Sequence, residues 1–137
     1  MNRHQQREQA FLLLFESMFS SKGFKRIINS KLLVEDFKIT KFAEFLFQGV
    51  CENHNKIENM IEKNIIAWEK NRLSKVALCV LKIAIFEMIF VDSIPISVSI
   101  NEAIEIAKKY GTEGDPVFVN GVLGIIAIKL KSINHTA

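Results

Sequence analysis

The sequence predicts an all-α protein, a compact bundle of six or seven helices, and three observations favour this fold class. The 137 residues include only two prolines and six glycines, so few residues interrupt a helix. In most segments, apolar residues recur at the spacing of three and four that is typical of amphipathic helices. No segment shows the strict alternation of apolar and polar residues that is typical of a half-buried strand.

The N-terminal half contains four segments with helical spacing. The first, residues 5–19, places its apolar side chains on one face. A shorter helix is expected at residues 24–33, after the Ser-Ser-Lys-Gly break at residues 20–23. Two further stripes, at residues 42–50 and 57–65, predict one helix each on either side of a polar segment.

The C-terminal half is expected to begin with the central helix of the core. Residues 76–91 are apolar on nearly every side, and a helix of this kind is buried. Ile94-Pro95 ends it, because a residue before proline avoids the helical conformation. Residues 97–110 then form an amphipathic helix, with lysines in its last turn and Gly111 directly after it.

The stretch DPVFVNGVLG at residues 115–124 contains conflicting signals. Asn120-Gly121 between apolar residues is a strong hairpin signal. Asp115 and Pro116, however, suit the N-cap and the first position of a helix. Two short strands would need a sheet to join, and the sequence offers none. We therefore expect a helix in which Gly121 costs ~1 kcal/mol relative to alanine and allows a neighbouring helix to approach closely.

Composition and charge are those of one globular domain. Hydrophobic residues make up 49% and charged residues 24% of the chain, and the net charge is +3. No apolar run reaches the roughly 20 residues that span a bilayer, and the N-terminus has no apolar signal segment. Cys51 and Cys79 lack metal-ligand spacing, which favours reduced, buried thiols. We expect a cytoplasmic protein without a membrane segment.

Residue types that support catalysis are not grouped. The three histidines lie far apart, and there is neither a glycine-rich phosphate loop nor a nucleophile elbow. Glu102 and Glu105 have the spacing of di-metal bundles, but no histidine follows at the matching offset. The sequence therefore predicts no catalytic residue, no metal site and no cofactor.

The N-terminus carries the strongest polar signal. Arg3, His4 and Arg7 fall on adjacent turns, and three glutamines beside them carry amides that can bind base edges. Basic and amide groups of this kind are typical of an RNA-binding helix start. A solvated first turn explains the same pattern, and both interpretations remain open at this point.

The second half contains the run PISVSINEAIEIAKKYG, a short acidic loop and then FVNGVLG. With the run VLKIAIFE at residues 80–87 and the start Arg7-Glu8-x-Ala10, these blocks closely resemble the NusB-type transcription antitermination factors. The resemblance spans essentially the whole chain. It implies one all-helical domain, residues 1–137, made of two packed subdomains at about residues 1–70 and 71–137.

The resemblance also implies a function without catalysis. Members bind the boxA element of ribosomal RNA leader transcripts together with ribosomal protein S10, within an RNA polymerase antitermination complex, and some self-associate as homodimers. Carried over to this chain, the RNA surface is expected at Arg3, His4, Arg7 and Phe118. The S10 surface is expected at Leu78, Lys82, Glu113 and Asp115.

Some positions depart from the family pattern, and two alternatives follow. The basic N-terminal segment has only two arginines, Arg3 and Arg7. Val117 and Ala77 stand where a lysine and a glutamate are usual in the family. One alternative is a helical scaffold that binds only protein. The other is the NusB-like domain of ribosomal RNA cytosine methyltransferases, although a chain from Met1 to Ala137 with a full helical set favours the antitermination factor.

Overall fold

Seven helices and no strand make up the parts of the chain that the computed structural model describes, residues 1–20, 23–33, 38–65 and 73–136. The all-α prediction is therefore confirmed. The helices are α1 (Arg3–Ser17), α2 (Phe24–Leu32), α3 (Lys41–Glu52), α4 (His54–Asn64), α5 (Lys75–Phe90), α6 (Ile96–Tyr110) and α7 (Asp115–Thr136).

Side-chain caps fix where three helices begin. Asn2 and Gln5 form a capping box at the start of α1, in which each side chain accepts a hydrogen bond from the backbone of the other residue. Thr40 caps α3 by accepting from the backbone N–H of Ala43. Ser74 caps α5 in the same way. Each cap satisfies backbone donors that a helix start leaves unpaired.

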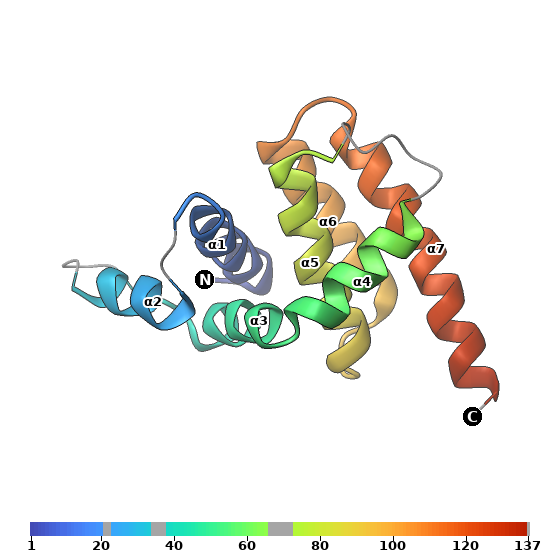
Figure 1. Cartoon of the computed structure of the whole chain (residues 1–137), viewed down its shortest axis with the longest axis horizontal. Coiled ribbons are helices and arrows are strands. Elements are labelled where there is room, and N and C mark those ends of the chain that lie inside the picture. Colours follow the sequence, from blue (N-terminus) through green and yellow to red (C-terminus); the bar gives the residue numbers. More distant parts are fainter. Residues whose placement is uncertain (21–22, 34–37, 66–72, 137) are drawn as a thin grey trace.

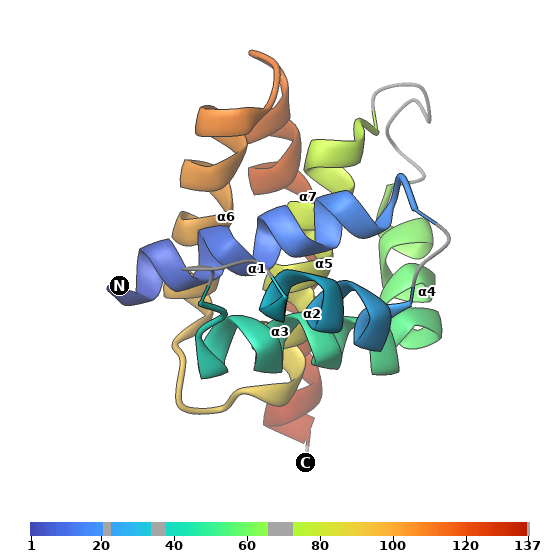
Figure 2. The ribbon, with the colours of Figure 1, turned by 90° about the vertical axis from the view of Figure 1, so that its left-hand side faces the viewer.

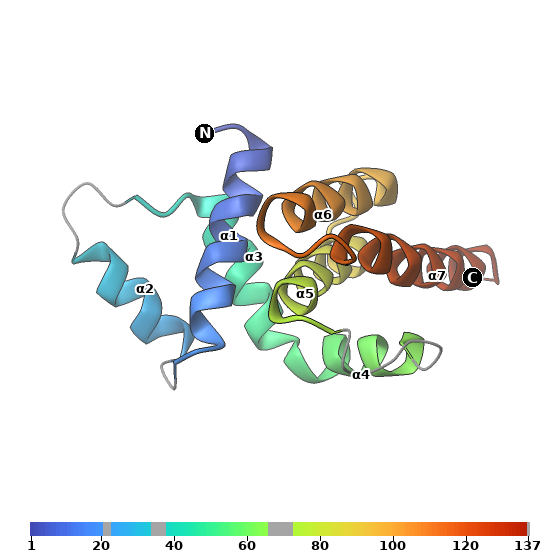
Figure 3. The ribbon, with the colours of Figure 1, turned by 90° about the horizontal axis from the view of Figure 1, so that it is seen from above.

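The helices are arranged around α5. This helix contacts α1 and α3 on one side and α4, α6 and α7 on the other (Figures 1 and 3). Figure 2 shows α1 running above and alongside α3, with α2 packed on the outside of both. The expected boundary between subdomains at residues 70 and 71 lies outside the described residues, and α4 packs against α5 and α7.

The prediction of a buried central helix is confirmed. Every residue from Cys79 to Met88 in α5 is buried, including two charged residues, Lys82 and Glu87. Both carry a charge into the core, and each has a partner of opposite charge, as burial of a charged side chain requires.

The stretch at residues 115–124 is helical, so Asn120-Gly121 lies within α7 and not in a hairpin. Its buried side chains include Val119, Val122 and Leu123, which pack in the core, whereas Asn120 is exposed. Asp115 is the first residue of α7 and not its N-cap. None of the described helices has the length and apolar character needed to cross a membrane.

Candidate nucleic-acid and protein-binding surfaces

Arg3 lies exposed at the first turn of α1. Its Nη1 atom donates a hydrogen bond of 3.0 Å to Oε1 of Gln6. The guanidinium lies over the ring of Phe42 in α3, with 3.9 Å between Cζ and the ring centroid. Arg3 forms no ion pair with a carboxylate among the described residues, so its charge is available to an anionic ligand.

His4 joins α1 to α6. Its Nδ1 atom hydrogen-bonds Oε2 of Glu102, and its Nε2 atom lies 4.0 Å from Oε2 of Glu8. The side chain is 37% exposed. His4 is therefore held between two carboxylates, although part of its ring reaches the surface beside Arg3.

Arg7 is placed differently from the prediction. Its side chain is buried, and its Nε atom donates to Oε2 of Glu87 at 2.8 Å. The other carboxylate oxygen of Glu87 accepts a hydrogen bond of 2.9 Å from the hydroxyl of Ser99. The network connects α1, α5 and α6, and it leaves Arg7 almost no surface for a phosphate.

The predicted site residues at the start of α7 also differ in exposure. Phe118 is only 4% exposed and belongs to the core, so as placed here it offers no ring to a base. Asp115 is also buried, and its Oδ2 atom accepts from the Ser74 hydroxyl at 3.0 Å and from the Thr112 backbone N–H at 2.9 Å. Glu113 is exposed and remains available to a partner.

The two residues of α5 that were predicted to contact a protein partner also differ in exposure. Leu78 is partly exposed, as a contact residue must be. Lys82 is 7% exposed, and its Nζ atom pairs with Oε1 of Glu58 in α4 at 2.7 Å. This ion pair between α4 and α5 stabilises the fold and leaves Lys82 little surface for a partner.

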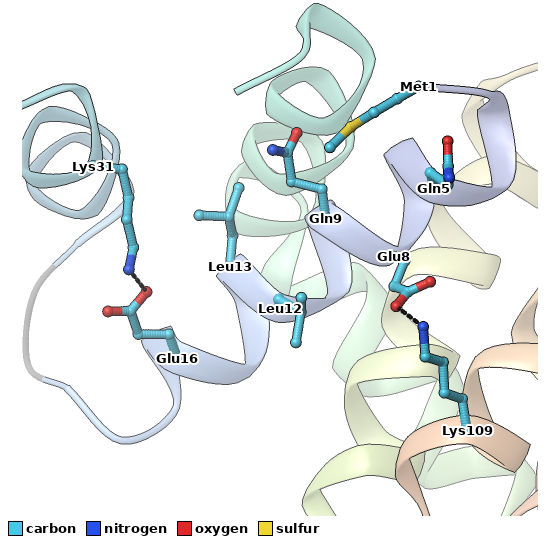
Figure 4. Close-up of a pocket in the computed structure, with 9 residues that line it drawn as sticks. All are labelled: Met1, Gln5, Glu8, Gln9, Leu12, Leu13, Glu16, Lys31 and Lys109. Atoms are coloured by element: carbon cyan, nitrogen blue, oxygen red, sulfur yellow. Dashed lines mark hydrogen bonds and ion pairs between the residues drawn. The ribbon is translucent and has the colours of Figure 1, made fainter. Parts of the chain in front are cut away.

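A cleft of about 540 Å³ runs along one face of α1 (Figure 4). Two ion pairs lie among its lining residues: Glu8 with Lys109 of α6 at 2.5 Å, and Glu16 with Lys31 of α2 at 3.0 Å. Leu12 is 46% exposed and forms part of the apolar wall. The cleft thus combines apolar surface with cations that are already paired.

The glutamines of α1 are largely occupied within the protein. The Oε1 atom of Gln9 accepts from the backbone N–H and the hydroxyl of Thr40, and its Nε2 atom donates to the carbonyl of Lys38. Gln6 donates to the carbonyl of Met1 and accepts from Arg3. Base recognition by these amides would require them to leave their present partners.

Glu8 has a perturbed pKa where α1 meets α6. Burial alone would raise it, but hydrogen bonds from Lys109 and Tyr110, with the charges of Lys109 and His4, bring the pKa below its usual value. Burial, together with the hydrogen bond to Glu8, raises the pKa of Tyr110. This cluster holds α1 and α6 together at neutral pH.

The two cysteines differ in burial. Cys79 is buried as expected, and burial raises the pKa of its thiol to about 12. Cys51 is exposed, which contradicts the expectation of a buried thiol, because its position on α3 faces solvent. Both are free thiols. Within the described parts of the chain, no three histidine, cysteine or acidic residues are grouped to hold a metal ion.

Residues 4–127 match the family model described as the NusB family. The chain belongs to the NusB family. A transcription antitermination protein NusB of Clostridium novyi is 40% identical over 129 residues, which cover 90% of this chain and 96% of that relative. The relatives are named as antitermination proteins and not as enzymes, which agrees with the absence of catalytic motifs.

Solved structures of NusB proteins share the fold. NusB of T. maritima superimposes with a TM-score of 0.80 at 38% identity, over 93% of this chain and 91% of that one. The NusB chain in a crystal structure of the antitermination factors NusB and NusE in complex with dsRNA has a TM-score of 0.74 at 26% identity. That match covers 94% of this chain and 99% of the other.

The sequence did not reveal the role of Phe42. The helical spacing of Phe42 predicts a core position, yet its half-buried ring carries the Arg3 guanidinium at the surface. The contact joins residues that are 39 positions apart, so no local pattern encodes it. One sequence feature could have pointed to a surface role for these rings. Phe42, Phe45 and Phe47 lie within six residues, and one face of a helix cannot bury all three.

Proposed function

We propose that this NusB family member binds boxA RNA of ribosomal RNA leader transcripts together with ribosomal protein S10, within an RNA polymerase antitermination complex in the cytoplasm. One observation carries the proposal. The fold matches, over 94% of the chain, a NusB protein that was crystallised with NusE, which is S10, and dsRNA. The family assignment supports it independently.

The exposed residues support an RNA surface at the start of α1. Arg3 carries an unpaired charge there, and His4 lies beside it. Because a neutralised phosphate releases counterions, even one such cation makes RNA binding depend on salt. Arg7 holds α1 against α5 through its ion pair with Glu87, and Phe118 lies in the core on α7, so neither side chain offers surface to RNA as placed here.

The proposed S10 surface includes Leu78 and Glu113, which have surface to offer, whereas Asp115 and Lys82 stabilise the helices that position them. Self-association as a homodimer stays a prediction. The 40% identity to a Clostridium novyi protein named as a transcription antitermination protein supports the antitermination factor over the methyltransferase alternative.

A titration of a fluorescent boxA RNA tests the proposal. The RNA is titrated with this protein, with S10 and with both proteins, at two salt concentrations. We expect the two proteins together to bind more tightly than either alone, and salt to weaken binding. Equal, weak binding to boxA and a scrambled RNA in every condition would contradict the proposal and favour a scaffold that binds only protein.

A further inference from the structure

Four phenylalanine rings form a continuous row across α3 and α5. Phe42 and Phe45 belong to α3, and Phe86 and Phe90 to α5. The ring centroids lie 6.4 Å apart for Phe42 and Phe45, 5.4 Å for Phe45 and Phe86, and 5.3 Å for Phe86 and Phe90. We call these four residues the aromatic row.

Two rings of the aromatic row are open to solvent. Phe45 is 47% exposed and Phe90 is 41% exposed, while Phe86 lies buried between them at 3%. A single exposed apolar side chain is common on protein surfaces. Large aromatic side chains that share one exposed row are instead typical of a binding surface.

Two hollows follow the row and meet at Phe45. One, of about 630 Å³, is lined by Arg3, Phe42 and the apolar side chain of Val98 among others. The other, of about 330 Å³, is lined by Phe86 and Phe90 among others. The rings thus lie along a hollowed surface that leads away from the start of α1.

A cation lies at each end of the aromatic row. The Arg3 guanidinium is 3.9 Å from the centroid of Phe42, and Nζ of Lys56 in α4 is 5.2 Å from the centroid of Phe90. Among the described residues, neither cation has a carboxylate partner, unlike Lys82 and Lys109, which both do. The row is therefore flanked by uncompensated positive charge.

The carboxylates in the two hollows are engaged with other side chains. Glu102 is hydrogen-bonded to His4 in the first hollow, and Glu52 accepts a hydrogen bond from the amide of Gln48 in the second. An anionic ligand that follows the rings thus meets two free cations, and each acidic group already has a hydrogen-bond donor.

We propose that the two exposed rings of the aromatic row, Phe45 and Phe90, stack on unpaired bases of a single-stranded RNA, with Arg3 and Lys56 contacting phosphates at the two ends of the row. Exposed rings interleaved with cations are the usual means of binding single strands, since every base has a face that can stack. An apolar protein segment would use the rings but leave both cations without partners. The inference rests on the proposed RNA-binding function and extends its surface from α1 to α5.

The test replaces both exposed rings by leucine, as Phe45→Leu with Phe90→Leu. This variant keeps apolar surface and removes base stacking. By fluorescence anisotropy with a single-stranded RNA that contains boxA, we expect its affinity to fall roughly tenfold or more. The same RNA annealed to its complement has no unpaired bases, so its binding is expected to be unaffected by the substitutions.

Phe19→Leu is a matched control. Phe19 is 61% exposed, and Nζ of Lys75 lies 4.1 Å from its ring centroid, so it offers the same chemistry outside the row. We expect this variant to bind RNA like the wild type. Lys56→Ala is a second test that leaves every ring in place, and it should weaken binding and lower the log–log salt slope by about 1.

Four other results would each contradict RNA binding by the aromatic row, and each has a different meaning. Wild-type affinity in both the double-leucine variant and Lys56→Ala, with weakened binding in Arg3→Ala, would refute the aromatic row and leave the proposed function standing. Loss of S10 binding with unchanged RNA affinity would make the row a protein-binding surface. An equal loss in Phe19→Leu would show a non-specific effect. A wild-type protein that binds no RNA, even with S10, would refute both proposals.

Discussion

Arg7 and Glu87 form an ion pair inside the protein, with 2.8 Å between Nε of Arg7 and Oε2 of Glu87 and side chains that are only 5% and 1% exposed. The pair joins the first helix to the central helix, and Ser99 of α6 completes the coordination of the carboxylate. Loss of either residue would leave the other charge buried without a partner, so the pair favours the present packing of α1 on α5.

Removing one partner of this pair should destabilise the protein strongly. In Arg7→Met, the Glu87 carboxylate stays buried without a cation, which costs about 3–5 kcal/mol. The free energy of unfolding in urea measures the effect. The double variant Arg7→Met with Glu87→Met should recover most of the loss, since no buried charge remains.

Arg26→Met is the control for this prediction. Arg26 is an exposed arginine on α2, where a surface substitution changes stability by about 0.5 kcal/mol or less. An equal effect of Arg7→Met and Arg26→Met would mean that the Arg7–Glu87 pair is not closed to water in solution.

The same pair shows why the fold was easier to predict from the sequence than the binding surface. Helix positions depend on local spacing, and each of the expected helical segments is present. Arg3 and Arg7 are four residues apart on one helix face, so local spacing cannot tell which is exposed. Arg7 is the buried one because it pairs with Glu87, which lies 80 residues further along the chain. Glu87 is the only carboxylate in the mostly apolar helix at residues 76–91, and this was the one sequence signal of a buried cation beside it.

Phe118 shows that a residue expected at the surface can lie in the core. The family resemblance placed it at the RNA surface, but α7 turns its ring into the core. The direction of a side chain depends on how the helix is rotated against its neighbours, and that rotation follows from the whole core. The exposed rings of Phe45 and Phe90 could not be recognised for the same reason.

Gly49 is expected to be intolerant of any side chain. A Cβ atom at Gly49 in α3 would lie 2.1 Å from Cζ of Phe86, 2.3 Å from Cε1 and 2.8 Å from Cε2 of the same ring. Overpacking of this kind costs about 1–3 kcal/mol, of which the helix preference of alanine offsets ~1. Gly49→Ala should therefore lower the free energy of unfolding, measured by urea denaturation.

Gly124→Ala is the matched control on another helix. A Cβ atom at Gly124 meets no other atom within 4 Å, so only the gain in helix preference remains. We expect Gly124→Ala to stabilise the protein by about 0.4–1 kcal/mol. A Gly49→Ala protein as stable as Gly124→Ala would show that Phe86 moves aside without cost.

Glu8 should make stability depend on pH in the acidic range. Its pKa lies below the usual 4.5 because hydrogen bonds from Lys109 and Tyr110 outweigh burial, which acts in the opposite direction. A carboxyl with a lowered folded-state pKa contributes stability that is complete above the unfolded value and is lost as pH falls through the folded one. Glu8→Gln should therefore lower the Tm at pH 7, and the difference from wild type should shrink below pH 4.5.

Melting curves of both proteins between pH 7 and pH 3 measure this dependence. Glu105→Gln is the control, because the Glu105 side chain is 59% exposed and pairs only loosely with Lys108 at 3.5 Å. Its Tm should follow the wild type at every pH. A Glu8→Gln difference that stays constant down to pH 3 would contradict a role for the charge.

Arg3 should account for the salt dependence that the N-terminus contributes to RNA binding. The pattern of two basic residues suggested that both contact phosphates, but Arg7 has its charge neutralised by Glu87, so only Arg3 can release counterions there. Arg3→Ala should weaken RNA binding and lower the log–log salt slope by about 1. Affinities at four or more salt concentrations give the slope. Lys131→Ala, which removes an exposed lysine from α7, should leave it unchanged. A slope that falls equally in both variants would mean that RNA senses the net charge of the protein and not a site at Arg3.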